Sequence, residues 1–340
     1  MTLSLCTFNI NNLYTRYRFG KKIPGEKSQK DQPAETEPGH PFTANPKLFV
    51  PLGKAKRNLA AEAITGDMGR YPDILCLQEV ESLPVLRRFN EDHLRSAYSY
   101  AFLVESRDAR RIHTGVLSKR PLQRIRSHLD IPDRRGTFLF PRDCLEIEVK
   151  AETGSGETLT LLVNHFKSGL EKDAAGLKEA FSLRERQAEG VVEILRERFP
   201  GPAFDTGLFA VIGDLNDHPD SEALRPLTRE SGLVDALGRI TDQRARWTYW
   251  LRKKNSVFPF DQVLLSPRLD EISQSSRPRI ERRGIGFRRY VKKKLQGPKR
   301  VYLPQPGSRE PGRIDFQFDR FPEVTPKVEA SDHCPVFFSF

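Results

Sequence analysis

The stretch FAVIGDLNDHPDSEAL, Phe209 to Leu224, starts as a continuous apolar run and turns polar after Gly213. An apolar run without alternation is typical of a strand that is covered on both faces of its sheet. Asp214, Asn216 and Asp217 follow this run directly. Burying such groups costs free energy unless they find hydrogen-bond or ionic partners. The stretch therefore predicts a covered sheet and directs attention to the residues at its strand ends.

Apolar and β-branched runs of strand length recur along the whole chain. The nine predicted strands are Thr2–Ile10, Asp73–Val80, Ser99–Glu105, Thr114–Ser118, Cys144–Lys150, Thr158–Phe166, Leu208–Asp214, Phe260–Ser266 and Pro335–Phe340. Apolar residues three and four positions apart predict helices over Lys54–Met68 and Phe181–Phe199. The GSGE sequence at Gly154–Glu157 predicts a hairpin. Strands and helices that do not strictly alternate favour an α/β fold with two packed mixed sheets flanked by helices.

Length and composition are those of a large globular protein. With 340 residues, 37% of them hydrophobic, the chain can bury a large core, and we expect a single domain over residues 1–340. Two segments rich in charge, proline or glycine, about 20–53 and about 275–326, are predicted surface insertions. No stretch of about 18 uncharged apolar residues occurs, and the start MTLSLCTFNI lacks a basic leader. We therefore expect a cytoplasmic protein without stable membrane association; the sequence does not indicate an oligomeric state.

The four cysteines, Cys6, Cys76, Cys144 and Cys334, all lie within apolar runs and show no CxxC spacing. This pattern favours reduced cysteines in the core over a zinc site or a disulfide framework.

Positive charge is concentrated in one segment. Lys and Arg number 56 against 45 Asp and Glu, a net charge of +11. Residues Arg277–Arg300 contain eleven Lys or Arg and one Glu, so this segment alone carries +10. Such a segment suits the backbone of a polyanion, although a solvated loop would have the same composition.

Polar residues capable of catalysis lie at the end or start of six predicted strands. They are Asn9, Asn11 and Asn12; Gln78 and Glu79; Asn164, His165 and Lys167; Asp214 and Asn216; Asp261; and Asp332 and His333. One such group is ordinary, because Asn and Asp cap turns and a lone His is commonly structural. Their joint occurrence indicates a site that balances its charges with a metal ion or an anionic substrate.

The segments TFNINN, DILCLQEV, LLVNHFKS, VIGDLND, FDQVLLS and SDHCPV, in this order, resemble the motif series of the endonuclease/exonuclease/phosphatase superfamily. This superfamily includes deoxyribonucleases, abasic-site endonucleases, sphingomyelinases and inositol polyphosphate phosphatases. The resemblance spans Leu3 to Phe340. It implies a four-layer α/β sandwich, two packed mixed sheets flanked by helices, with the active site at one edge.

The resemblance also implies a metal site and a phosphate site. Glu79 corresponds to the main Mg²⁺ ligand, with Asn11 and Asp332 as further direct or water-mediated ligands, and Mn²⁺ is a possible substitute. Such oxygen donors are those that Mg²⁺ prefers. Asn9 and Asn216 correspond to amides that hold the scissile phosphate or the nucleophile.

The remaining correspondences concern proton transfer. Asp214 matches the carboxylate that orients or deprotonates the attacking water, and His333 the histidine that contacts the phosphate. Asp261 matches the carboxylate that keeps His333 in one tautomer. The sequence leaves open whether Asp214 or His333 takes the proton. His165 matches a second histidine, which could protonate the leaving group if it is charged.

Two features depart from the family pattern. In RRIHTGVLSK, His113 or Thr114 stands where relatives often carry an acidic residue, so the partner of His165 is missing or comes from elsewhere. The gap between Asp261 and Asp332 contains the basic segment.

Candidate substrate contacts are cationic residues flanking these motifs. They are Arg111, near Arg107 and Arg110 in ESRDARRIHTG, and Arg288, Arg289, Lys292 and Lys293 in the basic segment. The arginines of ESRDARRIHTG fit a solvated turn equally well. Phe287 and Tyr290 either stack on bases or pin the segment to the body.

The sequence thus favours a Mg²⁺-dependent nuclease, an endonuclease in preference to an exonuclease, that hydrolyses nucleic acid by in-line attack of an activated water. A phosphatase or phospholipase acting on a small phosphoester, an inositol phosphate or a sphingolipid head group is the alternative. A catalytically silent nucleic-acid-binding protein is less favoured, because every matched acidic and imidazole position is filled.

Overall fold

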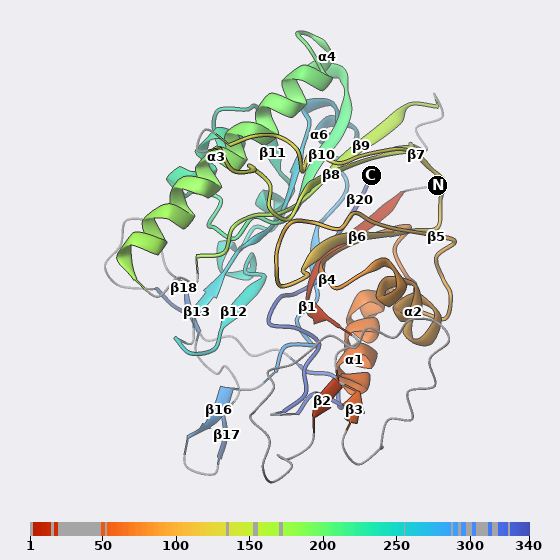
Figure 1. The fold of residues 1–340 in the computed structure, drawn as a ribbon, viewed down its shortest axis with the longest axis vertical. Coiled ribbons are helices and arrows are strands. Elements are labelled where there is room, and N and C mark those ends of the chain that lie inside the picture. The colour runs from red at the N-terminus through yellow and green to blue at the C-terminus, as the bar shows by residue number, and fades with distance from the viewer. Residues whose placement is uncertain are drawn as a thin grey trace.

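The computed structural model describes residues 3–14, 17–19, 49–51, 53–133, 136–151, 156–169, 173–254, 256–286, 288–291, 294–296, 301–303, 312–314, 319–325 and 327–340. Two six-stranded mixed sheets form its body (Figure 1). The first has the order β15 (Arg279–Ile280), β20 (Val336–Ser339), β1 (Ser4–Leu13), β4 (Ile74–Val80), β6 (His113–Ser118) and β5 (Tyr100–Leu103). The second has the order β11 (Val234–Asp235), β14 (Asp261–Leu265), β10 (Leu208–Asp214), β9 (Thr158–His165), β8 (Cys144–Lys150) and β7 (Leu122–Arg126).

The core is arranged in layers that confirm the predicted sandwich. Side chains of β1, β4 and β20 pack against side chains of β9, β10 and β14 in the space between the sheets. The outer face of the first sheet is covered by α1 (Lys54–Thr65) and α2 (Leu83–His93). The outer face of the second sheet is covered by α3 (Ala174–Arg198), the long helix in Figure 1. Because both faces of each sheet are buried, the central strands are continuously apolar, as their sequences indicate.

Smaller elements complete the fold. The helical ones are η1 (Gly66–Met68), α4 (Ala203–Thr206), η2 (Glu222–Leu224), α5 (Arg225–Thr228), η3 (Ala236–Arg239), η4 (Gln243–Ala245) and α6 (Pro267–Ile272). A further sheet has the order β12 (Tyr249–Leu251), β13 (Ser256–Phe258), β18 (Val301–Leu303) and β19 (Gly312–Ile314). Two strand pairs are β16 (Arg288–Val291) with β17 (Lys294–Gln296), and β2 (Tyr17–Phe19) with β3 (Phe49–Pro51).

All nine predicted strands are present, with ends that differ by a few residues. The first predicted helix ends at Thr65 and continues as a short 3-10 turn, and the second begins earlier than predicted, at Ala174. The side chain of Asp173 caps this helix by accepting a hydrogen bond from the backbone N–H of Gly176. The predicted hairpin joins β8 and β9, which pair antiparallel. Helix α2 was not predicted; Ser82 caps it by accepting a hydrogen bond from the N–H of Val85.

The second predicted insertion begins later than its composition indicates. Strand β15 pairs antiparallel with β20 at the edge of the first sheet. Glu281 and Ile285 are buried. Residues 279–285 therefore pack on the body of the protein. The sequence did not show this, because a two-residue edge strand is too short to produce a periodic pattern. Most of the first predicted insertion, 20–48, lies outside the described residues.

The prediction of reduced core cysteines is confirmed, since all four cysteines are free and buried. In the described part of the chain, no helix combines the length and the apolar character that crossing a membrane requires.

Candidate active site

Strand directions bring the polar strand ends to one edge of the sandwich. Strand β1 runs parallel to β4, and β9 runs parallel to β10, so the carboxyl ends of each pair meet. Strands β14 and β20 run antiparallel to these neighbours and therefore start at the same edge. The register pairs Asp214 with His165 on one side and with Asp261 on the other. Six segments far apart in sequence thus contribute to one site.

Gly213 is required where β10 turns toward the site. Its φ is +128°, a conformation that L side chains rarely adopt. A Cβ at this position would lie 2.0 Å from the backbone oxygen of Asn164. The close approach of β10 to β9, which sets Asp214 beside His165, therefore depends on glycine.

Three residues at the strand ends hold left-handed backbone conformations. Asn11, Glu79 and Asn216 have φ values of 51°, 65° and 54°. Such conformations cost free energy in residues other than glycine and persist only where the surrounding structure imposes them. Their occurrence on three separate strand ends at one site agrees with a functional role.

Asp214 is the most heavily hydrogen-bonded acid of the site and is 1% exposed. Its Oδ2 accepts hydrogen bonds from Asn9 Nδ2 at 2.9 Å and Asn216 Nδ2 at 3.0 Å. Its Oδ1 accepts one from the backbone N–H of Asn216 at 2.9 Å. The two amides predicted to hold phosphate or nucleophile therefore orient the carboxylate between them.

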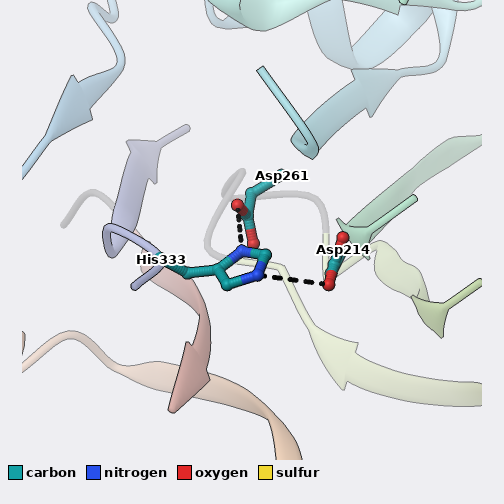
Figure 2. Close-up of side chains that lie close together, drawn as sticks. All are labelled: Asp214, Asp261 and His333. Atoms are coloured by element: carbon teal, nitrogen blue, oxygen red, sulfur yellow. Dashed lines mark hydrogen bonds and ion pairs between the residues drawn. The ribbon is translucent and has the colours of Figure 1, made fainter. Parts of the chain in front are cut away.

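His333 lies between two carboxylates (Figure 2). Its Nδ1 is 2.9 Å from Asp261 Oδ2, and its Nε2 is 3.7 Å from Asp214 Oδ2. Because a carboxylate only accepts, Nδ1 carries a proton, as the predicted tautomer requires. Burial would lower the pKa of His333, but the charges of Asp261 and Asp214 outweigh this effect and raise the pKa. Burial raises the pKa of Asp214, and the charge on His333 opposes that rise.

The loop that carries His333 is fixed from both sheets. Ser331 donates a hydrogen bond from Oγ to the backbone oxygen of Asn9 at 2.7 Å and accepts one from the N–H of His333. Thr248 accepts a hydrogen bond from the N–H of Asp261 through its hydroxyl, and its backbone oxygen accepts from the N–H of Cys334. The imidazole is therefore positioned by backbone contacts as well as by Asp261.

A cavity of about 580 Å³ lies over these groups. Of the nine residues predicted to be catalytic or metal-binding, eight line it: Asn9, Asn11, Glu79, His165, Asp214, Asn216, Asp332 and His333. Asp261 lies behind His333 and is fully buried. Four cations also line the cavity: Arg110, Arg142, Arg184 and Lys254.

Two sets of side chains could hold a metal ion. Ligand atoms of Asp214, Asp261 and His333 lie within 4.8 Å of one another. In this set, however, Nδ1 of His333 and Oδ2 of Asp261 are already joined by their hydrogen bond. These atoms suit a histidine–carboxylate pair better than a metal site.

The second set comprises Glu79, Asp332 and Asn11, and its chemistry fits a hard divalent cation. Among described residues, the hydrogen bond that Glu79 accepts is a long one of 3.5 Å from Asn9 Nδ2. Asp332 Oδ1 accepts from Asn11 Nδ2 at 2.7 Å. Both carboxylates raise the pKa of nearby Lys56, which burial lowers. Carboxylate oxygens with unused lone pairs suit Mg²⁺.

His165 has a partner that the sequence did not reveal. Arg142 Nη1 lies 2.7 Å from His165 Nε2, and the same imidazole nitrogen is 3.6 Å from Asp214 Oδ2. Burial, together with the charges of Arg142 and His333, holds the pKa of His165 well below its ordinary value. A neutral imidazole at neutral pH does not meet the condition under which His165 was expected to act as an acid.

Arg142 is the main site residue that sequence reasoning missed. The signal for it was the polar pair Arg142–Asp143 directly before the apolar strand β8, which pairs with the strand that ends in His165. Tyr249 was also missed; its ring centroid lies 4.6 Å from that of His333.

The predicted substrate contacts are placed differently. Arg111 is exposed and is not among the cavity-lining residues, whereas its neighbour Arg110 is. Arg107 pairs with Asp130 instead. Lys292 and Lys293 lie outside the described residues, as do the side chains of Arg288 and Arg289.

Described arginines at the start of the basic segment contact the protein itself. Arg279 stacks over Phe337, with its guanidinium carbon 4.1 Å from the ring centroid. Arg282 lies over Trp247 at 4.6 Å, and Arg283 pairs with Glu281. These arginines of the basic segment therefore contact aromatic and acidic side chains of the protein itself.

Several solved structures are similar to this protein over the whole fold. Truncated TDP2 from Caenorhabditis elegans is 16% identical with a TM-score of 0.53, over 100% of this chain and 98% of that chain. Sphingomyelinase C from Streptomyces griseocarneus is 15% identical with a TM-score of 0.53, over 100% and 99%. The 3′ phosphatase NExo from Neisseria, bound to a product DNA hairpin, is 14% identical with a TM-score of 0.50, over 99% of each chain. At these identities the likeness shows the fold.

No curated protein matches the sequence significantly. The family model described as "Endonuclease/Exonuclease/phosphatase family" matches residues 6–333, which include every strand end of the site. The two mixed sheets with flanking helices have the same architecture as the similar solved structures. The chain therefore belongs to the endonuclease/exonuclease/phosphatase family of phosphoester hydrolases.

Proposed function

We propose that this protein is a Mg²⁺-dependent phosphodiesterase that hydrolyses nucleic acid. One observation carries the proposal: eight of the nine expected catalytic and metal-binding residues line a single cavity, and the ninth supports His333 from behind. Hydrolysis of a phosphodiester requires a positioned water, cations around the phosphate and stabilisation of the departing oxygen. The cavity offers a group for each requirement.

Asp214 is the candidate that orients the attacking water and accepts its proton. Burial raises the pKa of this carboxyl, which makes it a stronger base than an exposed aspartate. Asn9 and Asn216 fix its oxygens by hydrogen bonds. His333, charged through its contacts with Asp261 and Asp214, is the candidate that holds a phosphate oxygen.

Glu79 and Asp332 would hold the cation, with Asn11 beside them. When bound, Mg²⁺ supplies positive charge that offsets the negative charge developing on phosphate and leaving oxygen. Lys56, whose Nζ donates to the backbone oxygen of Asn11, fixes the strand end that carries this site.

The cavity is lined by charges of both signs, and its cationic side chains support a polyanionic substrate. Arg110, Arg142, Arg184 and Lys254 line it, and cationic side chains bind the phosphates of nucleic acids. The similar NExo structure contains a DNA hairpin, which also supports nucleic acid as the substrate class.

One observation favours a second candidate, a sphingolipid head group. Tyr249, Phe258 and Phe260 line the cavity beside His333, and the rings of Tyr249 and Phe260 stack at 5.1 Å. Aromatic faces attract quaternary ammonium groups. The similarity in fold to sphingomyelinase C is consistent with this alternative.

A substrate panel separates the two. Purified protein with Mg²⁺ is given plasmid DNA, single-stranded and duplex oligonucleotides, RNA, sphingomyelin and inositol phosphates, and products are resolved by length. We expect cleavage of nucleic acid that EDTA abolishes and that the Glu79→Ala variant lacks. The Asp235→Asn variant, altered outside the cavity, is the matched control. Turnover of sphingomyelin with nucleic acid untouched would establish the alternative, and no turnover of any phosphoester would refute both.

A further inference from the structure

Arg142 is a buried guanidinium in the wall of the catalytic cavity, just before β8. It is 4% exposed. Its Nη1 donates to His165 Nε2 at 2.7 Å and to the backbone oxygen of Phe166 at 2.8 Å. Its Nε donates to Asp108 Oδ2 at 3.1 Å. These contacts join three separate parts of the chain and hold the guanidinium plane in one orientation.

One nitrogen of this guanidinium remains for a ligand. The Nη2 group carries two N–H donors and makes no hydrogen bond to any described residue, although the side chain is almost wholly buried. Arginine stays charged in proteins, and Nη2 itself is not fully shielded from the cavity. A cavity-lining Arg142 with two unused donors is therefore suited to an anionic oxygen.

The local charge is not cancelled by Asp108. This carboxylate also accepts two side-chain hydrogen bonds from Arg110, at 3.0 and 2.8 Å. Burial would raise the pKa of Asp108, but the hydrogen bonds from Arg110 and the charge of Arg142 outweigh this effect and lower it. Two guanidinium groups thus share one carboxylate, so Asp108 alone does not neutralise both of them.

The hydrogen bond from Arg142 also assigns the tautomer of His165. Guanidinium nitrogens only donate, so His165 Nε2 is the acceptor and its proton lies on Nδ1. Nδ1 is buried and has no partner among the described residues. The nitrogen on the Asp214 side, Nε2, therefore has no proton to deliver to a leaving group.

We infer that Arg142 is a catalytic residue that binds an oxygen of the scissile phosphoester through Nη2, and that His165 is the neutral acceptor that positions Arg142. The inference rests on the proposed hydrolase function. It assigns to the second histidine of this chain a role in positioning an arginine, instead of the proton transfer that the resemblance implies.

Paired substitutions test this division of roles. A glutamine amide oxygen can occupy the place of histidine Nε2, whereas the shorter asparagine cannot reach Arg142. We expect H165Q to keep at least about tenfold more activity than H165N, and R142M to lose about 10- to 100-fold, the effect of a charge-assisted hydrogen bond. Two substrates are compared, bis-(p-nitrophenyl) phosphate, whose leaving group needs no proton, and a dinucleotide. We expect the losses to be similar on both.

A proton-donor role makes the opposite prediction. Both H165Q and H165N would then lose about 10²- to 10⁴-fold on the dinucleotide and recover on the p-nitrophenyl ester. That result would overturn the inference. Thermal unfolding is measured for each variant, and R142K, which keeps the charge but cannot make all three contacts, replaces R142M if the latter does not fold.

A readout without turnover separates this inference from the proposed function. Inorganic phosphate is titrated into the parent protein and R142M in the presence of Mg²⁺, with binding heat as the signal. We expect at least about tenfold weaker binding to R142M. Equal affinities would overturn the inference even if the parent hydrolyses nucleic acid. An inactive parent would refute the proposed function, while the loss of phosphate affinity would still support Arg142 as an anion-binding residue.

Discussion

Replacing Asp261 by Asn removes the carboxylate that holds His333 and should make the activity of the variant depend on pH in a defined way. Asp261 is fully buried, and its Oδ2 lies 2.9 Å from His333 Nδ1. Asp214, the other acid at His333, is farther away at 3.7 Å. Asparagine keeps the shape of the side chain but cannot supply the charge that raises the pKa of His333.

The expected size follows from this geometry. An opposite charge at hydrogen-bond distance typically shifts a pKa by about 1 to 3 units, which corresponds to about 1.4 to 4 kcal/mol. In the variant, the imidazolium of His333 is therefore lost at lower pH than in the parent. Despite burial, contacts with both acids raise the pKa of His333 to about 10 in the parent, and a loss of about 2 to 3 units would leave it near 7 to 8. We therefore expect kcat/KM to fall by roughly tenfold near pH 6 and by roughly 40- to 300-fold near pH 8.5.

Stability should change with pH in the opposite direction. A histidine whose pKa is raised on folding contributes stability fully below its unfolded pKa of about 6.5, and this contribution is lost as pH rises through the folded pKa. The D261N variant lacks much of that contribution. Its deficit in the free energy of unfolding should therefore be largest near pH 6 and shrink toward pH 9.

The assay is hydrolysis of bis-(p-nitrophenyl) phosphate with saturating Mg²⁺ at several pH values, together with urea unfolding at the same values. The Asp235→Asn variant makes the same chemical change on neighbouring strand β11, where Asp235 Oδ1 caps a 3-10 turn by accepting from the N–H of Leu237. We expect the activity of this control, relative to that of the parent, to stay constant over the pH range. A parent-to-D261N activity ratio that stays constant from pH 6 to 8.5 would refute the reasoning.

Three further changes test other parts of the structure. Glu79→Gln should weaken Mg²⁺ binding by roughly 10- to 100-fold, seen as a smaller Mg²⁺-induced rise in the unfolding temperature, and an unchanged affinity would remove Glu79 from the metal site. Gly213→Ala should cost about 3 kcal/mol or more in urea unfolding, because its Cβ would lie 2.0 Å from the oxygen of Asn164 at a φ of +128°; a loss below about 1 kcal/mol would contradict this account. Burial raises the pKa of Glu146, but the hydrogen bond from His128 together with the charges of Arg126, His128 and Arg198 outweighs this effect and lowers the pKa. This carboxylate therefore stabilises the fold above about pH 4.3 and loses that effect as pH falls through its lower folded pKa. Glu146→Gln should therefore destabilise the protein more at about pH 7 than at about pH 3, and an equal loss at both would count against an ionised Glu146.

Local pattern predicted most of the scaffold. The runs at Ile74–Val80 and Leu208–Asp214 are strands because continuous apolar character is a property of a few adjacent residues. Helix α2 escaped prediction because its eleven residues mix charged side chains with a short apolar face. The early start of α3 depends on the cap at Asp173, a local signal that the apolar periodicity of the helix does not include.

By itself, then, the sequence determined the strands, their covered sheets and the groups that stand at the strand ends, because apolar runs and the polar residues that interrupt them are encoded locally. The tertiary structure decided which of those groups meet. Antiparallel pairing sets Cys144 opposite Asn164, and this register carries Arg142 to Phe166 and His165. Likewise, Arg110 and not Arg111 reaches the cavity. Contacts of this kind depend on strand order and register across the whole sheet, which no short stretch of sequence contains.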